Sequence, residues 1–217
     1  MKTRKSVNKA FAAVLIIGIV SVAALIYFRA DGRNNSTGQS TEIDISSYTD
    51  KSSKNNLDLV EWAKCAEKAH WGYVWGTYGE ILDRTKLAQK EIQYPENVGG
   101  YERFIKENWL NGRTADCVGL IKGYCWLNAE TLTIEYCTNG TPDINTDTMY
   151  ETAKEKGEID TIPEIIGLAV WQKGHIGVYI GDGYVIEAKG TEYGVVKTKL
   201  KDGSWTHWLK IPYIEYR

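Results

Sequence analysis

One of the four cysteines in this chain occupies a position that favours a nucleophile. Cys117 follows residues 114–116 (TAD) at the start of a predicted helix, where free backbone N–H groups and the helix dipole stabilise a thiolate. We therefore expect a lowered pKa for this thiol, although the negative charge of Asp116 opposes the shift. The alternative is a buried cysteine that only fills space at a helix start.

A histidine and a glutamate complete a catalytic set with this thiol. His175 opens the predicted strand 175–180, and Glu187 lies inside the predicted partner strand 184–189. Glutamate is uncommon in strands and costly to bury without a partner. A thiol, an imidazole that takes its proton and a group that orients the imidazole form the minimal set for nucleophilic catalysis. The alternative is an ordinary surface hairpin that carries both side chains.

The register of this hairpin decides whether the two side chains meet. Side chains alternate along a strand, so a two-residue turn at 182–183 places His175 and Glu187 on opposite faces. A three-residue loop over 181–183, with Gly183 in the left-handed region, shifts the register by one and pairs Gly177 with Glu187. We expect this second register if the pair is catalytic.

The other histidines and cysteines are weaker candidates for chemistry. His70 ends a predicted helix and His207 lies between two tryptophans, where packing is the simpler role. No two cysteines or histidines have the two-residue spacing of a structural zinc site, so we expect no metal. Cys65 is expected to be a buried apolar side chain. Whether Cys125 and Cys137 form a disulfide stays open.

Four sequence blocks resemble one family. Residues 116–120 (DCVGL), 174–181 (GHIGVYIG) and 185–188 (VIEA) are similar to the NlpC-type cysteine peptidases of bacterial cell walls. Residues 73–76 (YVWG) resemble the aromatic-glycine segment of that family, whose tyrosine lines the site. The resemblance covers most of residues 57–217. It implies a papain-like fold with Cys117 as nucleophile, His175 as general base and no cofactor.

Two positions depart from the family pattern. Glu187 occupies the third catalytic position, where many members carry His, Asn or Gln, and a carboxylate there is closer to the related CHAP amidases. Val118 replaces a residue that is usually Ser or Ala. The stretch between residues 136 and 163 is longer than in a minimal member, which leaves its part in specificity open.

The resemblance also implies a substrate, an amide bond in the stem peptides of peptidoglycan. Tyr73, Trp75, Asp116 and Trp171 are the candidate substrate-binding residues. A catalytically silent wall-binding module and an acyltransferase or amidase with the same three catalytic residues are the alternatives. A glycosidase that uses Glu67 or Glu80 with a second carboxylate is a further one.

The elements that position these residues change type along the chain. Apolar periodicity predicts helices at 57–69, 81–90, 101–108, 114–128 and 147–157, with Asn56, Thr114 and Asp147 as caps. Short strands separated by turn residues are predicted at 167–171, 175–180, 184–189, 193–198 and 206–216. Helices followed by an antiparallel meander indicate an α+β fold, with the N-terminal helices packed on a C-terminal antiparallel sheet.

The N-terminal segment predicts a membrane anchor. Four basic residues precede the uncharged stretch 10–28, which as a helix spans about 28 Å, close to the thickness of a bilayer core. Basic residues stay on the cytoplasmic side, so we expect residues 1–29 to be a signal-anchor and the rest to lie outside the membrane. Cleavage near residues 21–23, which would release a secreted protein, is the alternative.

The remaining chain divides into a tether and one domain. Residues 30–56 are polar and are expected to be a disordered tether, and residues 57–217 form the predicted catalytic domain. The whole chain of 217 residues has a formal net charge of −2, but residues 57–217 contain 18 basic and 24 acidic residues. An acidic domain argues against nucleic acid as a partner, because phosphate binding needs a clustered basic surface. The sequence does not indicate an oligomeric state.

Overall fold

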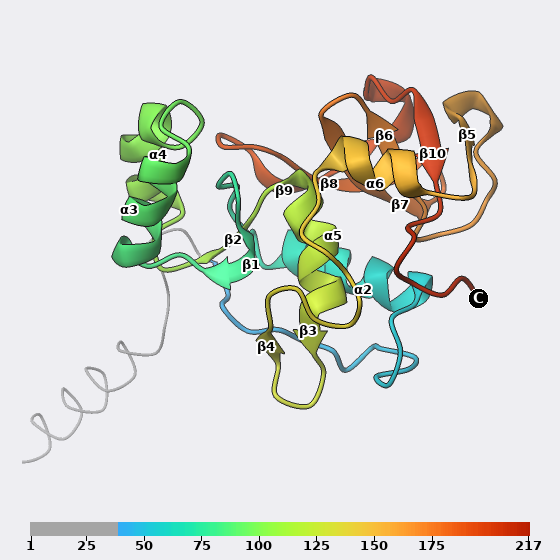
Figure 1. Cartoon of the computed structure of the whole chain (residues 1–217), viewed down its shortest axis with the longest axis horizontal. Coiled ribbons are helices and arrows are strands. Elements are labelled where there is room, and N and C mark those ends of the chain that lie inside the picture. The colour runs from blue at the N-terminus through green and yellow to red at the C-terminus, as the bar shows by residue number, and fades with distance from the viewer. Residues whose placement is uncertain (1–38) are drawn as a thin grey trace, which may run out of the picture. The chain divides into compact units, whose positions relative to one another are not determined.

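A computed structural model describes residues 39–217, in which helices precede a mainly antiparallel sheet, as the sequence predicts (Figure 1). The helices are α2 (Asn56–Lys68), α3 (Arg84–Gln93), α4 (Glu102–Asn108), α5 (Cys117–Trp126) and α6 (Thr146–Thr152). Three short 3₁₀ helices cover Gly99–Tyr101, Ile159–Thr161 and Leu200–Asp202.

The main sheet has six strands in the order β5-β10-β6-β7-β8-β9, and all neighbours are antiparallel. Its strands are β5 (Lys156–Glu158), β6 (Ala169–Gln172), β7 (His175–Gly181), β8 (Tyr184–Gly190), β9 (Gly194–Lys199) and β10 (His207–Leu209). Two smaller sheets pair β1 (Tyr78–Ile81) with β2 (Arg113–Ala115), and β3 (Leu127–Asn128) with β4 (Thr133–Ile134). The α+β class predicted from the sequence is therefore confirmed.

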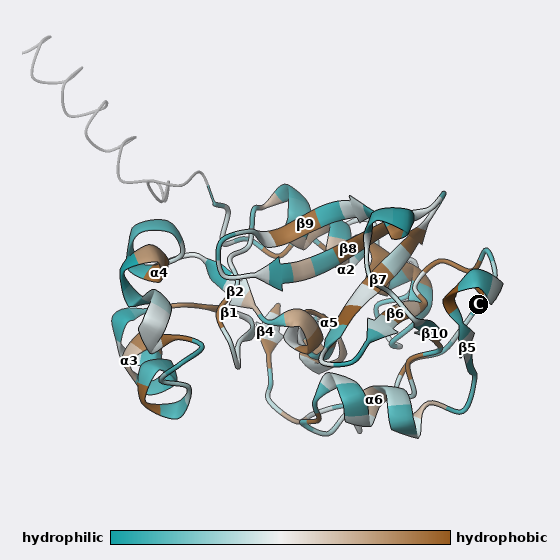
Figure 2. Cartoon of the chain, turned by 90° about the horizontal axis from the view of Figure 1, so that it is seen from above, coloured by the Kyte–Doolittle hydropathy of each residue, from teal (hydrophilic) through white to brown (hydrophobic). Residues whose placement is uncertain are grey.

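The helix α5 is the centre of the core, and all ten of its residues are buried. In Figure 2 hydrophobic residues are prominent on α5 and β7, whereas α3 and α4 are largely hydrophilic. Two glycines let residues 77 and 78, where β1 begins, approach the helix closely. An added Cβ would lie 1.9 Å from the Thr77 carbonyl oxygen at Gly119 and 2.0 Å from that of Tyr78 at Gly123. Only glycine fits at these two positions. Direct backbone contact with residues 77 and 78 therefore fixes the position of the helix that begins with Cys117.

The helix caps differ from the predicted ones. Asn55 caps α2, Asp116 caps α5 and Asn145 caps α6, and in each case the side chain accepts the backbone N–H three residues further on. Thr114 belongs to the strand β2 instead, and Asp147 lies inside the first turn of α6. The sequence places several cap-forming residues near each helix start, and the tertiary position of the chain selects among them.

The segment before α2 packs on the domain. Ile43 and Ile45 are buried in the main core, and the backbone N–H groups of Thr49 and Asp50 donate to the buried carboxylate of Asp58. A disordered tether over residues 30–56 is therefore not what the structure has from residue 39 onward. The polar composition of this segment suggests disorder, but burial of Ile43 and Ile45 and hydrogen bonds to the Asp58 carboxylate stabilise it on the domain.

The predicted membrane span at residues 10–28, within the anchor segment 1–29, lies outside the described residues, as does the first part of the tether. Among residues 39–217, the structure contains no helix with the length and apolar character that a bilayer crossing requires.

The β7–β8 hairpin reaches the expected register by a different turn. Asp182 and Gly183 both have left-handed backbone conformations, with φ of 51° and 70°, and Gly181 pairs directly with Tyr184. The turn therefore has two residues, and the predicted three-residue loop is wrong, although Gly183 is left-handed as expected.

A bulge next to the turn restores the predicted pairing. The register shifts between Tyr179 and Gly181, where Gly181 itself has a φ of 92°. Beyond this bulge Val178 pairs with Ile186, which is the register that brings residue 177 opposite residue 187. A bulge adds one residue to one strand and so moves every later side chain to the other face.

Candidate active site

His175 and Glu187 meet on one face of the main sheet. The His175 Nε2 atom lies 2.7 Å from the Glu187 Oε2 atom, and the Thr198 hydroxyl donates to the Glu187 Oε1 atom at 2.7 Å. These residues come from β7, β8 and β9, three neighbouring strands. The predicted convergence of His175 and Glu187 is confirmed. Thr198 has no signal in the sequence beyond its place in a predicted strand, so its contact was missed.

These hydrogen bonds determine the charge of Glu187 and the tautomer of His175. Burial acts to raise the pKa of Glu187, but the hydrogen bonds from His175 and Thr198 outweigh it and hold the pKa below its usual value. An ionised carboxylate can only accept, so the His175 Nε2 atom must carry a hydrogen. In the neutral ring Nδ1 is then an acceptor, and no group within residues 39–217 hydrogen-bonds to it.

Trp205 covers the imidazole of His175. The two rings are stacked, with centroids 5.3 Å apart and an interplanar angle of 14°. Gly177 leaves room for this arrangement, because an added Cβ would lie 3.2 Å from the Trp205 ring and 3.3 Å from the Glu187 Cβ. The expectation that residues 205–208 only pack a terminal strand is therefore incomplete. The ring excludes water from the His175–Glu187 contact, which strengthens it.

Cys117 stands at the first position of α5 and is 6% exposed. Burial, together with the negative charge of Asp116, raises the pKa of its thiol to about 12. The backbone N–H groups of Val118 and Ile176 act in the opposite direction but do not compensate. The expected lowered pKa is therefore wrong for the free protein, because the sequence shows the helix start but not the burial. At neutral pH the thiol is protonated and needs a base.

Asp116 fixes the start of the helix that carries Cys117. One carboxylate oxygen accepts the Gly119 N–H at 2.6 Å, and the other accepts the Gly76 N–H at 2.8 Å. Burial raises the pKa of this carboxyl group, while Lys122 and the two N–H groups lower it. Asp116 thus joins the start of α5 to the aromatic-glycine segment. Both carboxylate oxygens of Asp116 accept hydrogen bonds from the protein itself. Holding these two segments together therefore suits Asp116 better than the predicted contact with substrate.

Cys117 opens into a cavity of about 590 Å³, which we call the Cys117 cavity. Tyr73 and Trp75 line it, as predicted, but Trp171 does not. Instead Trp171 stacks on Tyr150, with ring centroids 4.1 Å apart. The sequence around Trp171 does not indicate this partner, which lies about 20 residues earlier in the chain. The long stretch after residue 136 contributes a whole wall, and its lining residues are Tyr136, Asp143, Ile144, Asn145, Thr146 and Asp147.

Tyr73, in the aromatic-glycine segment, lines the cavity beside Cys117. Its side chain is 6% exposed, and burial together with the neighbouring Cys117 and Asp116 raises its pKa. Within the described residues no protein group hydrogen-bonds to its hydroxyl. The hydroxyl is therefore protonated and available to donate to a bound molecule next to the thiol.

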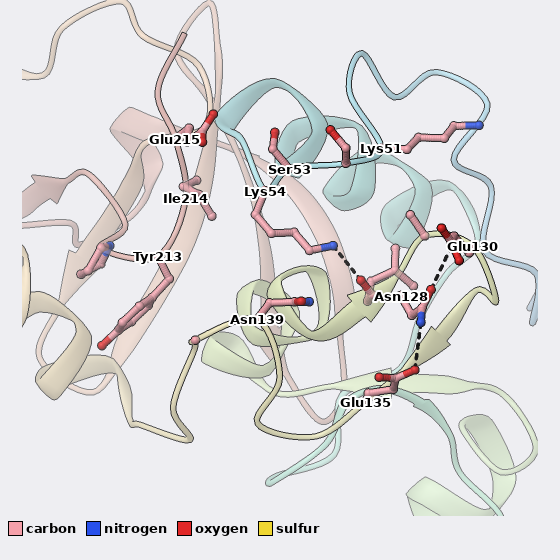
Figure 3. A pocket seen from close by; sticks show the side chains of 15 residues that line it. Lys51, Ser53, Lys54, Asn128, Glu130, Glu135, Asn139, Tyr213, Ile214 and Glu215 are labelled. Atoms are coloured by element: carbon pink, nitrogen blue, oxygen red, sulfur yellow. Dashed lines mark hydrogen bonds between the residues drawn. The ribbon is translucent and has the colours of Figure 1, made fainter.

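A second and larger cavity of about 1060 Å³ lies away from these residues. The residues drawn in Figure 3 come from the loop before α2, the β3–β4 hairpin with the loop that follows it, and the C-terminal segment. The polar groups there bind one another. Lys54 donates to the Leu127 carbonyl at 2.7 Å, and Asn128 donates to Glu135 at 3.0 Å. This cavity contains no nucleophile next to a base.

The remaining candidates are placed elsewhere in the fold. His207 contacts Glu158 at 3.3 Å and packs on Tyr150, and His70 is the left-handed residue that follows α2. Neither Glu67 nor Glu80 lines the Cys117 cavity.

The thiols and possible metal ligands give no second site. All four cysteines are free, and Cys65 is half-buried where a fully buried side chain was expected. Residues 39–217 bring together no group of three side chains that would hold a metal ion.

Comparison with known proteins gives a structural likeness only. No protein-family model matches the chain, and no curated protein matches its sequence. Among solved structures, the NlpC/p60 domain of the peptidoglycan hydrolase SagA is 15% identical at a TM-score of 0.42, over 72% of this chain and 99% of that domain. The peptidoglycan hydrolase RipB from Mycobacterium tuberculosis is 16% identical at a TM-score of 0.40, over 99% and 87% of the two chains.

A third structure is NlpC2 from Trichomonas vaginalis, which is 14% identical at a TM-score of 0.41. The match covers 78% of this chain and half of the length of that one. The family that the sequence blocks resemble is also the family of these structures.

Proposed function

We propose that this protein is a cysteine hydrolase that cleaves an amide bond, with Cys117 as nucleophile, His175 as general base and Glu187 as the residue that orients it. The observation that carries the proposal is the 2.7 Å contact between the His175 Nε2 and Glu187 Oε2 atoms. It directs the accepting Nδ1 atom away from Glu187. The backbone N–H of the next residue, Ile176, acts to lower the pKa of the Cys117 thiol, which places the start of β7 near the sulfur.

The reaction begins with the transfer of the thiol proton to His175 Nδ1 as the sulfur attacks the carbonyl carbon. His175 then gives this proton to the leaving amine, the C–N bond breaks and a thioester remains on Cys117. In the second half His175 takes a proton from a water molecule as its oxygen attacks the thioester. The C–S bond then breaks, the carboxylic acid leaves and His175 returns the proton to the Cys117 sulfur. Glu187 stabilises the imidazolium in both halves.

Two donors are suited to the negative oxygen that develops during attack. The backbone N–H of Cys117 is at the free start of α5, and the Tyr73 hydroxyl lines the same cavity. Donors that are fixed before the reaction stabilise the transition state without reorganisation.

We propose that the substrate is a peptidoglycan stem peptide. The similarity of residues 116–120, 174–181 and 185–188 to NlpC-type peptidases supports this class. The cavity of about 590 Å³ has the size of a site for a short peptide segment. The uncharged stretch 10–28 supports an extracytoplasmic location, with this stretch as the membrane anchor.

Digestion of purified peptidoglycan by the full chain tests the proposal, with mass spectrometry of the products. An amidohydrolase releases products with a new amine and a new carboxyl group, and iodoacetamide abolishes their release. New reducing sugar ends that survive alkylation would show a glycosidase. Binding without any product would show a silent wall-binding module. A product joined to an added amine in place of water would show an acyltransferase.

A further inference from the structure

The Cys117 cavity contains one lysine that has no ionic partner among the described residues. Two lysines line this cavity, Lys122 and Lys90. Lys122 forms an ion pair with Asp143. The closest polar contact of the Lys90 Nζ atom is the Gln93 side-chain oxygen at 3.3 Å, and this atom lies 5.7 Å from the centre of the Tyr94 ring. An ammonium group therefore faces the cavity without a counter-charge.

The carboxylates nearest to Lys90 already have partners. Glu80 accepts a backbone N–H at 2.6 Å and lies 3.6 Å from Lys86. Asp116 accepts two backbone N–H groups, and Asp143 pairs with Lys122. None of these groups is left to neutralise Lys90. Burial lowers the pKa of this lysine, and an anion brought into the cavity would raise it again.

The Lys90 ammonium group lies beside the loop that Asp116 joins to the start of α5. The Lys90 Nζ atom would lie only 3.1 Å from a Cβ at Gly76, where the backbone has a left-handed φ of 79°. The N–H of Gly76 is bound by Asp116, the residue before Cys117. Lys90 of α3 and Thr146 of α6 both line the cavity, and Figures 1 and 2 show these two helices on either side of α5.

We propose that Lys90 binds a carboxylate of the substrate in the part of the cavity that α3 lines, beside the rings of Trp75 and Tyr94. The inference rests on the proposed function and narrows its substrate class to peptides with a free carboxylate near the scissile amide. Aromatic rings exclude water from such an ion pair and so strengthen it.

Three synthetic tetrapeptides test the proposal with the full chain. All have the sequence alanyl-γ-glutamyl-lysyl-alanine in wall stereochemistry. The first has both carboxylates free, the second has the glutamyl carboxylate converted into a carboxamide, and the third has the terminal carboxylate converted. We would measure kcat/KM for the wild type, Lys90→Gln, Lys90→Glu and Arg84→Gln. Arg84 carries the same charge on the same helix but does not line the cavity.

For the wild type and Arg84→Gln, kcat/KM should be about tenfold higher for the first peptide than for one of the two amidated peptides. Lys90→Gln should reduce this preference to about twofold or less, and Lys90→Glu should reverse it. Thermal unfolding checks that the variants fold. Equal cleavage of all three peptides by the wild type, or an unchanged preference in Lys90→Gln, would overturn the carboxylate site while leaving the proposed function intact.

Calorimetric measurement of peptide binding to Cys117→Ala separates a failure of the carboxylate site from a failure of the proposed hydrolase function. If this variant binds the free carboxylate about tenfold more tightly than the amide, and the double variant with Lys90→Gln does not, the site stands even where no peptide is cleaved. Equal binding of all three peptides to Cys117→Ala would exclude the site independently of catalysis.

Discussion

The strand half of the candidate site holds its polar side chains in a hydrogen-bonded arrangement before any substrate arrives, whereas the helix half holds its thiol protonated. On the strands, His175, Glu187 and Thr198 form a continuous chain of hydrogen bonds under the ring of Trp205. On the helix, Cys117 is buried, protonated and next to a negative charge. In the proposed mechanism, His175 is therefore already oriented in the free protein, whereas Cys117 becomes a nucleophile only when its thiol gives a proton to His175.

The largest effect should come from removing the nucleophile. Cys117→Ala should lower kcat/KM for peptidoglycan peptides by at least about 10⁴-fold, because no covalent intermediate can form. Cys125→Ala is the matched control, since this buried cysteine lies on the same helix and outside the cavity. It should keep most of the activity and lose only about 1 kcal/mol of stability. Wild-type hydrolysis by Cys117→Ala would show that the mechanism is wrong.

Glu187→Gln tests the strand half directly. The amide has nearly the shape of the carboxylate but cannot stabilise an imidazolium, so we expect kcat to fall by about 10²-fold or more. The Thr198 hydroxyl can still pair with the side-chain oxygen, so thermal unfolding should change little. If the activity stays within about threefold of the wild type, another group orients His175 and the organised strand half has no catalytic role.

Gly177→Ala tests whether close packing holds this half together. The added Cβ would meet Val185 at 2.6 Å and lie 3.3 Å from the Glu187 Cβ. We expect a loss of about 1–3 kcal/mol of stability from overpacking and a drop of about tenfold in kcat as His175 and Glu187 separate. Chemical denaturation and steady-state kinetics measure the two effects. Gly183→Ala in the open turn changes stability through its left-handed φ but should leave kcat unchanged.

Thr198→Val should have a smaller effect with a defined pH dependence. The hydrogen bonds from His175 and Thr198 lower the pKa of Glu187, so they stabilise the carboxylate, and that stabilisation is lost as the pH falls through the folded pKa. Removing the hydroxyl raises this pKa. The acid limb of kcat/KM should therefore move to higher pH, with about a fivefold loss in kcat and recovery in Thr198→Ser. An unmoved acid limb would assign Thr198 a purely structural role.

The smallest expected effect is on the alkylation rate of Cys117 in the free protein, and it tests the difference between the helix half and the strand half of the site. Because burial and Asp116 raise the pKa of Cys117, its alkylation by iodoacetamide should be slow at neutral pH, with a midpoint above about 8.5. Mass spectrometry of peptides separates Cys117 from the exposed Cys137, which serves as the internal control. A midpoint near or below pH 7 would reveal a thiolate–imidazolium pair in the resting protein and remove the difference.

The sequence by itself determined the elements and the candidate residues of the site. Apolar periods and turn residues are local signals, and they located the helices, the β7–β8 hairpin and the order of helices before strands. The pairing of Glu187 with His175 followed from the two-residue repeat of a strand, once the register was chosen.

Only the tertiary structure decided the contacts between distant segments. The left-handed residues at 181, 182 and 183 produce the register through a bulge and a two-residue turn, where the sequence suggested a longer loop. Thr198, Trp205 and Lys90 join the site from other elements. The raised pKa of Cys117 depends on how many atoms surround the sulfur. Burial and pairing are properties of neighbours in space, and the spacing of residues along a chain does not contain them.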